Sequence, residues 1–133
     1  MKIKRYGLLR IVLFFAVILL SSYAIAQESP LIDSLKMRSQ QLKDTLLIET
    51  LDELSWEYKY VTMDSAFHYA NRALEIAKKI DYPKAIANSY NTLGSNYEYV
   101  SKLDSALYFY TKSLEIKRSI NRCKGQKKFR LGI

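Results

Sequence analysis

The chain has 133 residues, which leave room for one domain at most. Its net charge of +8 does not indicate a nucleic-acid-binding domain, because segments 1–26 and 117–133 hold eleven of the 21 basic residues and no acid, and the middle is mildly acidic. The single cysteine, Cys123, excludes an intrachain disulfide, and the single histidine, His68, excludes a metal site built from paired histidines.

The first 26 residues have the pattern of a cleaved signal peptide. Four basic residues precede the apolar run from Ile11 to Leu20. After the run, Ala24 and Ala26 are small residues at the positions that a signal peptidase recognises. The alternative is a retained membrane anchor, but the apolar segment is shorter than the roughly 20 residues that a spanning helix needs. We therefore predict cleavage after Ala26, export to a bacterial periplasm, and no stable membrane insertion of the mature chain.

Segment 27–43 is predicted to be a leader that contains one short helix, from Pro30 to Lys43. Leu31, Leu35 and Leu42 recur at helical spacing and would share one side of this helix. The helix is expected to precede the repeats that follow and not to belong to them.

The rest of the chain is organised by a repeat of about 40 residues. Stretches 64–81 and 104–121 share seven identities, including an Asp-Ser-Ala triplet and a Leu-Glu-Ile triplet. Upstream of each, apolar residues step by 4, 3, 4, 3, first from Leu47 to Val61 and then from Ile86 to Val100. This spacing is one stripe of an amphipathic helix. The sequence thus predicts an all-α chain of two helix–turn–helix repeats, with helices over 44–60, 63–80, 83–99 and 103–120.

Three of these helices have recognisable start signals. Asp44 is a suitable cap for the first helix, and Pro83 suits a first-turn position because its missing N–H would be unpaired there. Ser101 and Asp104 resemble a capping box at the start of the last helix.

At these residues the sequence resembles the tetratricopeptide repeat (TPR). Leu93-Gly94 and Tyr97 match the signature of its first helix, and Ala106 and Tyr110 match that of its second. The resemblance implies a fragment of an α-solenoid in which small residues let the helices approach closely. The packing residues that it assigns are Leu54, Tyr58, Ala66, Ala73, Leu93, Gly94, Tyr97, Ala106 and Tyr110.

The sequence segments LSWEY, DSA and SYNTLGSNY also resemble the periplasmic TPR regions of sensor histidine kinases and transcriptional regulators of the Bacteroidetes. After Ile120 no apolar stripe follows, and the end of the chain is interpreted as a basic tail or a truncated third repeat. The predicted segments are a signal peptide over 1–26, a leader over 27–43, repeats over 44–81 and 82–121, and a tail over 122–133.

We predict a scaffold that binds a protein or peptide, without catalysis and without a cofactor. His68 and Cys123 have no evident partner residues for nucleophilic or metal chemistry. No nucleic acid is expected as a partner, because tyrosines such as Tyr90 lie on the apolar stripe and not on an exposed stacking surface. Self-association through the exposed last helix is expected. The alternative function is the truncated sensory input region of a two-component histidine kinase or transcriptional regulator.

Polar residues beside the apolar stripe form the candidate binding face. Carboxamides and a hydroxyl in one column can bond to both N–H and C=O groups of an extended peptide. The alternative is an ordinary solvated helix face. The columns are Asn88, Asn91, Ser95 and Glu98 in the second repeat, and Glu49, Asp52, Trp56 and Lys59 in the first.

Overall fold

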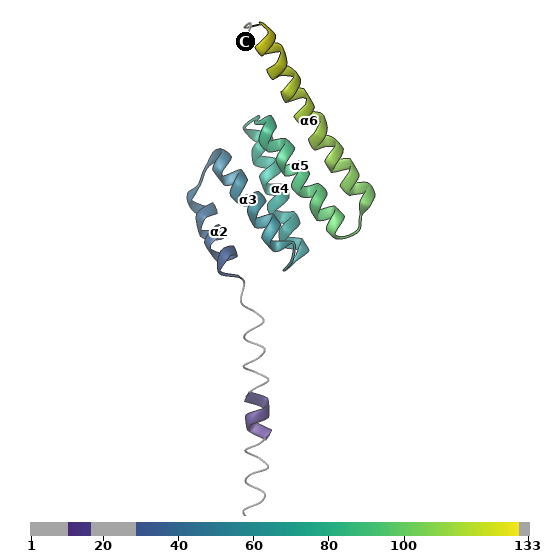
Figure 1. Ribbon diagram of the computed structural model, residues 1–133. Coiled ribbons are helices and arrows are strands. Elements are labelled where there is room, and N and C mark those ends of the chain that lie inside the picture. Colours follow the sequence, from purple (N-terminus) through teal and green to yellow (C-terminus); the bar gives the residue numbers. More distant parts are fainter. Residues whose placement is uncertain (1–10, 17–28, 131–133) are drawn as a thin grey trace, which may run out of the picture. The chain divides into compact units, whose positions relative to one another are not determined.

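The computed structural model describes residues 11–16 and 29–130, and its helices are drawn in Figure 1. Residues 11–16 are helical, and no strand occurs in either described stretch. The prediction of an all-α chain is therefore confirmed. Within these residues no helix has both the length and the apolar character needed to cross a bilayer. The helices after residue 29 are α2 (Pro30–Gln41), α3 (Asp44–Tyr58), α4 (Met63–Lys79), α5 (Pro83–Tyr99) and α6 (Leu103–Arg130).

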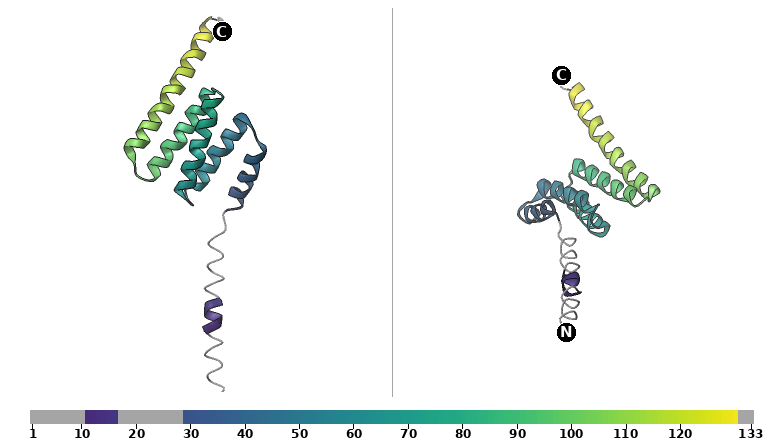
Figure 2. Two further views of the ribbon diagram at one scale, coloured as in Figure 1. Left: turned by 180° about the vertical axis from the view of Figure 1, so that it is seen from behind. Right: turned by 60° about the horizontal axis from the view of Figure 1, so that its bottom comes forward.

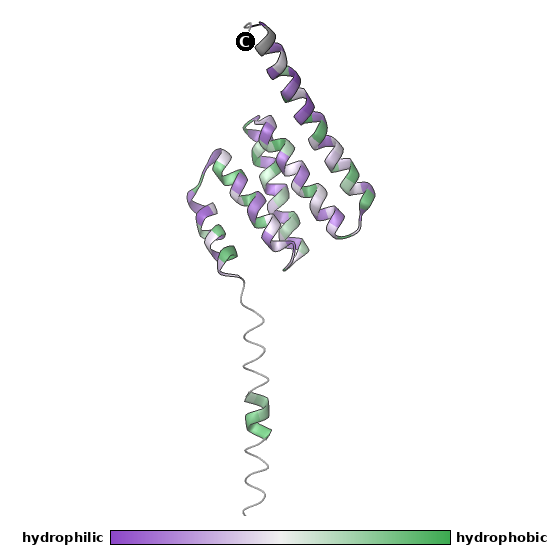
Figure 3. Cartoon of the chain, viewed as in Figure 1, coloured by the Kyte–Doolittle hydropathy of each residue, from purple (hydrophilic) through white to green (hydrophobic). Residues whose placement is uncertain are grey.

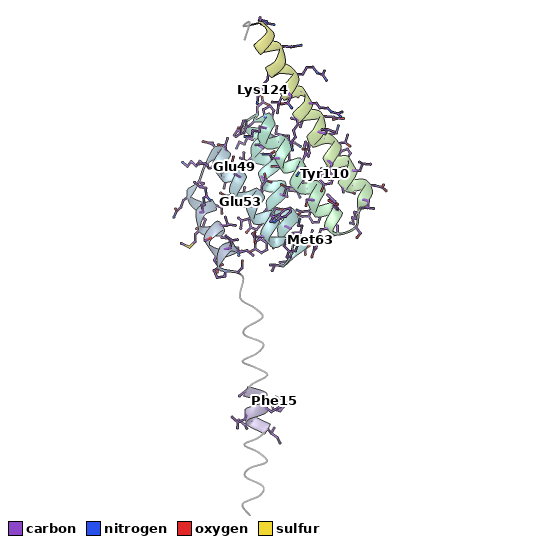
Figure 4. All side chains as sticks on the ribbon, viewed as in Figure 1. Phe15, Glu49, Glu53, Met63, Tyr110 and Lys124 are labelled. Carbon is purple, nitrogen blue, oxygen red and sulfur yellow. The ribbon has the colours of Figure 1, made fainter. Side chains whose placement is uncertain are left out.

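The proposed signal peptide lies mostly outside the described residues, which omit 1–10 and 17–28. In the part that is described, the five apolar side chains from Ile11 to Phe15 are each more than half exposed. Figure 4 labels Phe15 on this short helix.

The helices start where the sequence predicts, but α6 continues ten residues beyond its predicted end at Ile120. The predicted helix end at Ile120 is therefore wrong, because residues 121–130 are also helical. Lys, Arg and Gln are good helix formers, and Gly125 alone does not stop a helix. Figure 3 shows how hydrophilic this last part of α6 is. With 28 residues against 17 in α5, α6 is about 16 Å the longer of the two.

The turns between helices differ in chemistry from the predicted caps. Pro83 lies in the first turn of α5 as predicted. Ser101, expected as an N-cap, instead ends α5 in a left-handed conformation with φ 58°, and its N–H bonds to the carbonyl of Glu98. The next N–H, of Lys102, bonds to the carbonyl of Tyr97, which completes a Schellman motif. Asp44 is not the cap of α3 as predicted. The N-cap residue is Lys43, and its side chain forms no capping hydrogen bond.

Helices α2 to α6 follow one another in a single row (Figures 1 and 2). α2 packs on the row through Ile32 and Leu35, whereas Leu31, expected on the same side, is exposed. Val61, expected on the apolar stripe of α3, is 57 % exposed because α3 ends at Tyr58 and Val61 lies in the turn. The core thus ends one turn earlier than the apolar pattern suggested.

The seam at α4 is built from alanine. Ala66, Ala70, Ala73 and Ala77 are each 0 % exposed and recur at the spacing of one helix face. Side chains this small let α3 and α5 pack closely against α4. Larger side chains close the seam from the α3 side. They are Ile48, Leu51, Leu54 and Tyr58.

Contacts between aromatic rings connect α4, α5 and α6. The ring of Tyr97 lies 4.7 Å from that of Phe67 on α4 and 5.2 Å from that of Phe109 on α6, measured between centroids. Tyr90 lies 6.0 Å from Phe109. Such pairs contribute beyond the area that they bury. These tyrosines pack between helices, as the interpretation of the apolar stripe required.

Among the predicted packing residues, Gly94 shows most clearly why one position must lack a side chain. A Cβ atom at this position would lie 2.7 Å from two ring atoms of Tyr110 on α6. The corresponding pair in the first repeat is Ser55 and Ala70, where a small partner leaves room for a hydroxyl. Leu54, Tyr58, Ala66, Ala73, Leu93 and Ala106 are buried, and Tyr97 and Tyr110 are half-buried.

A buried polar cluster joins the two repeats. The Ser55 hydroxyl on α3 donates to the carbonyl of Ala66 on α4 at 2.8 Å and accepts from the Asn96 side chain on α5 at 2.9 Å. Ser55 and Asn96 are at most 1 % exposed. One buried hydroxyl therefore connects three helices.

We expect Ser55→Ala to lower the free energy of unfolding by about 2 kcal/mol, because it leaves the buried Asn96 amide donor unpaired and removes the side-chain hydrogen bond to the Ala66 carbonyl. The exposed Ser119 also donates to a backbone carbonyl, that of Ile116. Ser119→Ala is the matched control and should change stability by less than about 0.5 kcal/mol. Urea denaturation of both variants measures the difference. Equal effects would show that the cluster adds nothing.

Candidate binding face

The inner side of the helix row is formed by α3 and α5. These two helices contact each other directly, whereas α4 and α6 do not in the described part of the chain. In a row of helix pairs, the helices that lie closer together line the concave side. The predicted polar columns lie on these two helices, with Lys59 at the C-cap of α3.

Asn88 and Asn91 on α5 are exposed and form no side-chain hydrogen bond to any described residue. They lie one helical turn apart, on the side of α5 away from Leu93. Their carboxamides can each donate and accept. Of the predicted column, these are the two residues whose polar groups are fully available to a partner.

Ser95 and Glu98, the other half of this column, are already used inside the protein. The Ser95 hydroxyl accepts a hydrogen bond from Lys59 Nζ at 2.9 Å. The Glu98 carboxylate accepts one from the hydroxyl of Tyr110, the residue whose ring covers Gly94. Both side chains therefore hold helices in place, which the sequence did not reveal.

Lys59 is the most unusual of the predicted residues because it is only 5 % exposed. Its ammonium lies 3.5 Å from the centre of the Trp56 ring and 5.5 Å from that of Tyr60. Burial lowers the pKa of Lys59, and the nearby Glu98 carboxylate opposes that effect. The bond to Ser95, and a longer contact of 6.0 Å from the ammonium to the Tyr99 ring, connect the end of α3 to α5. Trp56 is about half exposed and flanks the concave side.

Asp52 on α3 is also engaged with α5. The Ser89 hydroxyl donates to its Oδ2 atom at 3.2 Å, while its Oδ1 atom is buried without a hydrogen-bond partner in the described structure. Burial raises the pKa of Asp52 from 3.8 to about 6, although the hydroxyls of Thr92 and Ser89 favour the charged form. Asp52 therefore belongs to the packing between α3 and α5, and its carboxylate is not freely available to a peptide ligand.

Comparison with known families gave one match. The family model of the tetratricopeptide repeat matches residues 62–119, which include α4, α5 and most of α6. The fold is a TPR-type α-solenoid fragment. Comparisons with curated proteins and with solved structures gave no significant match.

TPR repeats generally mediate protein–protein interaction and are typically non-catalytic scaffolds. The other chemical candidates of the sequence are His68 and Cys123. His68 is exposed on α4 beside Tyr69, and Cys123 is exposed on α6. Among the described residues no three His, Cys, Asp or Glu side chains cluster as metal ligands would.

Sequence reasoning missed a group of basic residues next to the TPR concave side. Lys84, in the first turn of α5, lines one groove with Lys117 and Lys124 of α6. Lys84 and Lys117 are far apart in the sequence, and the groove exists only because α6 continues as a helix. No local signal in the sequence brings these residues together.

Proposed function

We propose that the protein is an exported, non-catalytic scaffold that binds a peptide or protein segment along the concave side of α3 and α5. The TPR match supports protein binding in general. The observation that favours this side is the exposed pair Asn88 and Asn91, whose carboxamides are available next to a rigid, internally bonded surface. A preorganised surface loses little entropy when it binds a ligand.

Replacing both Asn88 and Asn91 with alanine should weaken binding about five- to a hundredfold, because each lost hydrogen bond contributes about 0.5–1.5 kcal/mol. Alanine is the better helix former, so helicity should be retained. The probe is a peptide selected from a displayed random library, and calorimetry measures its affinity. Asn71→Ala, an exposed carboxamide on α4, is the control. Unchanged affinity in the double variant would indicate that the column is an ordinary solvated face.

Export is the second part of the proposal. It is supported by the basic start, the apolar run and Ala24-Ile25-Ala26. N-terminal sequencing of the protein from the periplasm of a Gram-negative host should begin at Gln27. An intact Met1 in the membrane fraction would favour a retained anchor.

A two-component input region is not favoured as the function. The family match covers the repeats alone and points to protein binding in general. The resemblance to sensor kinases of the Bacteroidetes, and truncation of a longer gene product, stay predictions.

Self-association through α6 is part of the proposal as well. The outer face of this helix exposes Leu103 and Leu107 by about two thirds and Leu114 by almost half. Burying such a stripe against a second copy would remove apolar area from water. Sedimentation of the protein should show a concentration-dependent dimer that Leu107→Glu abolishes. A strictly monomeric species would exclude this contact.

A further inference from the structure

A groove of about 300 Å³ lies between the start of α5 and the C-terminal half of α6. Lys84 and Asn88 line it from α5. Lys117, Asn121 and Lys124 line it from α6, where their spacing of 4 and 3 places them on one helix face. Ile120 supplies an apolar, half-buried surface between them. Figure 4 labels Lys124 near the start of α5.

The groove is strongly positive. No acidic residue lines it, and none of its three lysines forms an ion pair with a described residue. The first turn of α5 adds to the positive field, because the N-cap Tyr82 provides no side-chain bond to the free N–H groups there. Three like charges around one concavity are stabilised by an anion.

The surroundings limit the size of that anion. Glu49 and Asp52 line the neighbouring small pocket, which also contains Lys84 and Asn88. A polyphosphate backbone that entered the groove from α6 would meet these acidic residues on α3. One or two carboxylates of a peptide fit the volume of the groove and can end before that point.

We propose that the groove binds acidic side chains of the partner segment, so that the preferred ligand of the concave side is an acidic peptide. The proposal rests on the proposed function, because Asn88 belongs to both the groove and the peptide-binding column. Lys84, Lys117 and Lys124 neutralise the carboxylates, and Asn88 and Asn121 donate hydrogen bonds to them. Asn91 lies outside the groove and contacts only the peptide backbone.

The test compares two fluorescein-labelled probes with amidated C-termini, hexaglutamate and hexaglutamine, by fluorescence anisotropy at about 50 mM salt, where screening is weak. We expect hexaglutamate to bind about tenfold more tightly. Lys117→Gln with Lys124→Gln should weaken hexaglutamate binding about five- to twentyfold and leave hexaglutamine binding unchanged. The matched control is Arg118→Gln with Arg122→Gln, which removes the same charge from α6 outside the groove and should cost about twofold or less.

Several results would overturn the proposal. Equal losses in the two double variants would show that the general charge of α6 attracts the peptide. Equal affinities for the two probes, or no hexaglutamate binding below about 1 mM, would exclude an acidic ligand. Tighter binding of a single-stranded oligothymidylate that displaces hexaglutamate would assign the groove to nucleic acid.

Asn91→Ala separates the two proposals. If it weakens the binding of both probes equally while the lysine variants have no selective effect, the concave side binds peptides and the acidic preference is wrong. If Asn91→Ala has no effect and the lysine variants act selectively, the groove binds anions and the peptide column is wrong.

Discussion

Gly94→Leu should lower the free energy of unfolding by about 3–5 kcal/mol, which is enough to unfold much of the population of a two-repeat fold at room temperature. A Cβ atom alone would lie 2.7 Å from the ring of Tyr110. The leucine side chain must therefore expel that ring, and the hydrogen bond from Tyr110 to Glu98 is lost with it. Thermal and urea denaturation followed by circular dichroism measure the loss.

Gly125 provides the control, because a Cβ atom there meets nothing within 4 Å. Gly125→Ala should raise helicity and stabilise α6 by up to about 1 kcal/mol. The contact itself is tested by a double-mutant cycle of Gly94→Ala and Tyr110→Ala, which reproduces the small partner that Ala70 provides in the first repeat. The two losses should be non-additive by about 1–2 kcal/mol. Additive losses would show that the ring and the glycine do not interact.

Asp52→Asn should stabilise the protein by about 2–3 kcal/mol at pH 7.5 and by almost nothing near pH 4. The pKa of Asp52 is raised from 3.8 to about 6 by burial. Because the pKa of Asp52 is higher in the folded state than in the unfolded state, folding favours the protonated form. The contribution of protonated Asp52 to the free energy of unfolding is therefore fully present below about pH 4 and is lost as the pH rises through about 6. Asparagine removes the charge and keeps an oxygen that can accept from Ser89.

Urea denaturation across this pH range measures the effect, and the free-energy difference between variant and parent should shrink as the pH falls. Glu53→Gln is the control, since it removes one charge from an exposed position on the same helix and should change stability by less than about 0.5 kcal/mol at pH 7.5. A variant that is less stable than the parent at pH 7.5 would mean that the Asp52 charge favours folding.

The periodic part of the fold could be predicted from the sequence because it follows from local spacing. The 4, 3, 4, 3 steps fix which side of α3 and α5 faces the core, and the repeated triplets fix where α4 and α6 begin. Gly94 could be recognised as a close contact for the same reason, since a family signature and a helix crossing both require a small residue there. These properties need no knowledge of long-range geometry.

What could not be predicted depends on pairs of residues that meet only in three dimensions. Lys59 and Asp52 read as free polar groups in one helix, but each forms a hydrogen bond with a serine about one repeat later, Ser95 and Ser89. Asn96 reads as a surface residue between Ser95 and Tyr97, yet it is buried by its bond to Ser55. A sequence pattern records which face a residue occupies and not which side chain it meets.

The unequal lengths of α5 and α6 affect how the lysine groove behaves over time. Its α5 wall is anchored in the core through Ala85 and Ala87, which are at most 6 % exposed, whereas residues 121–126 on α6 are all exposed. Amide hydrogens in that part of α6 are protected only by the helix itself, so they should exchange with deuterium far sooner than those near Ala106 and Ser113. A ligand bound in the groove would contact both α5 and the end of α6. Its binding should therefore slow the exchange of amide hydrogens along the end of α6.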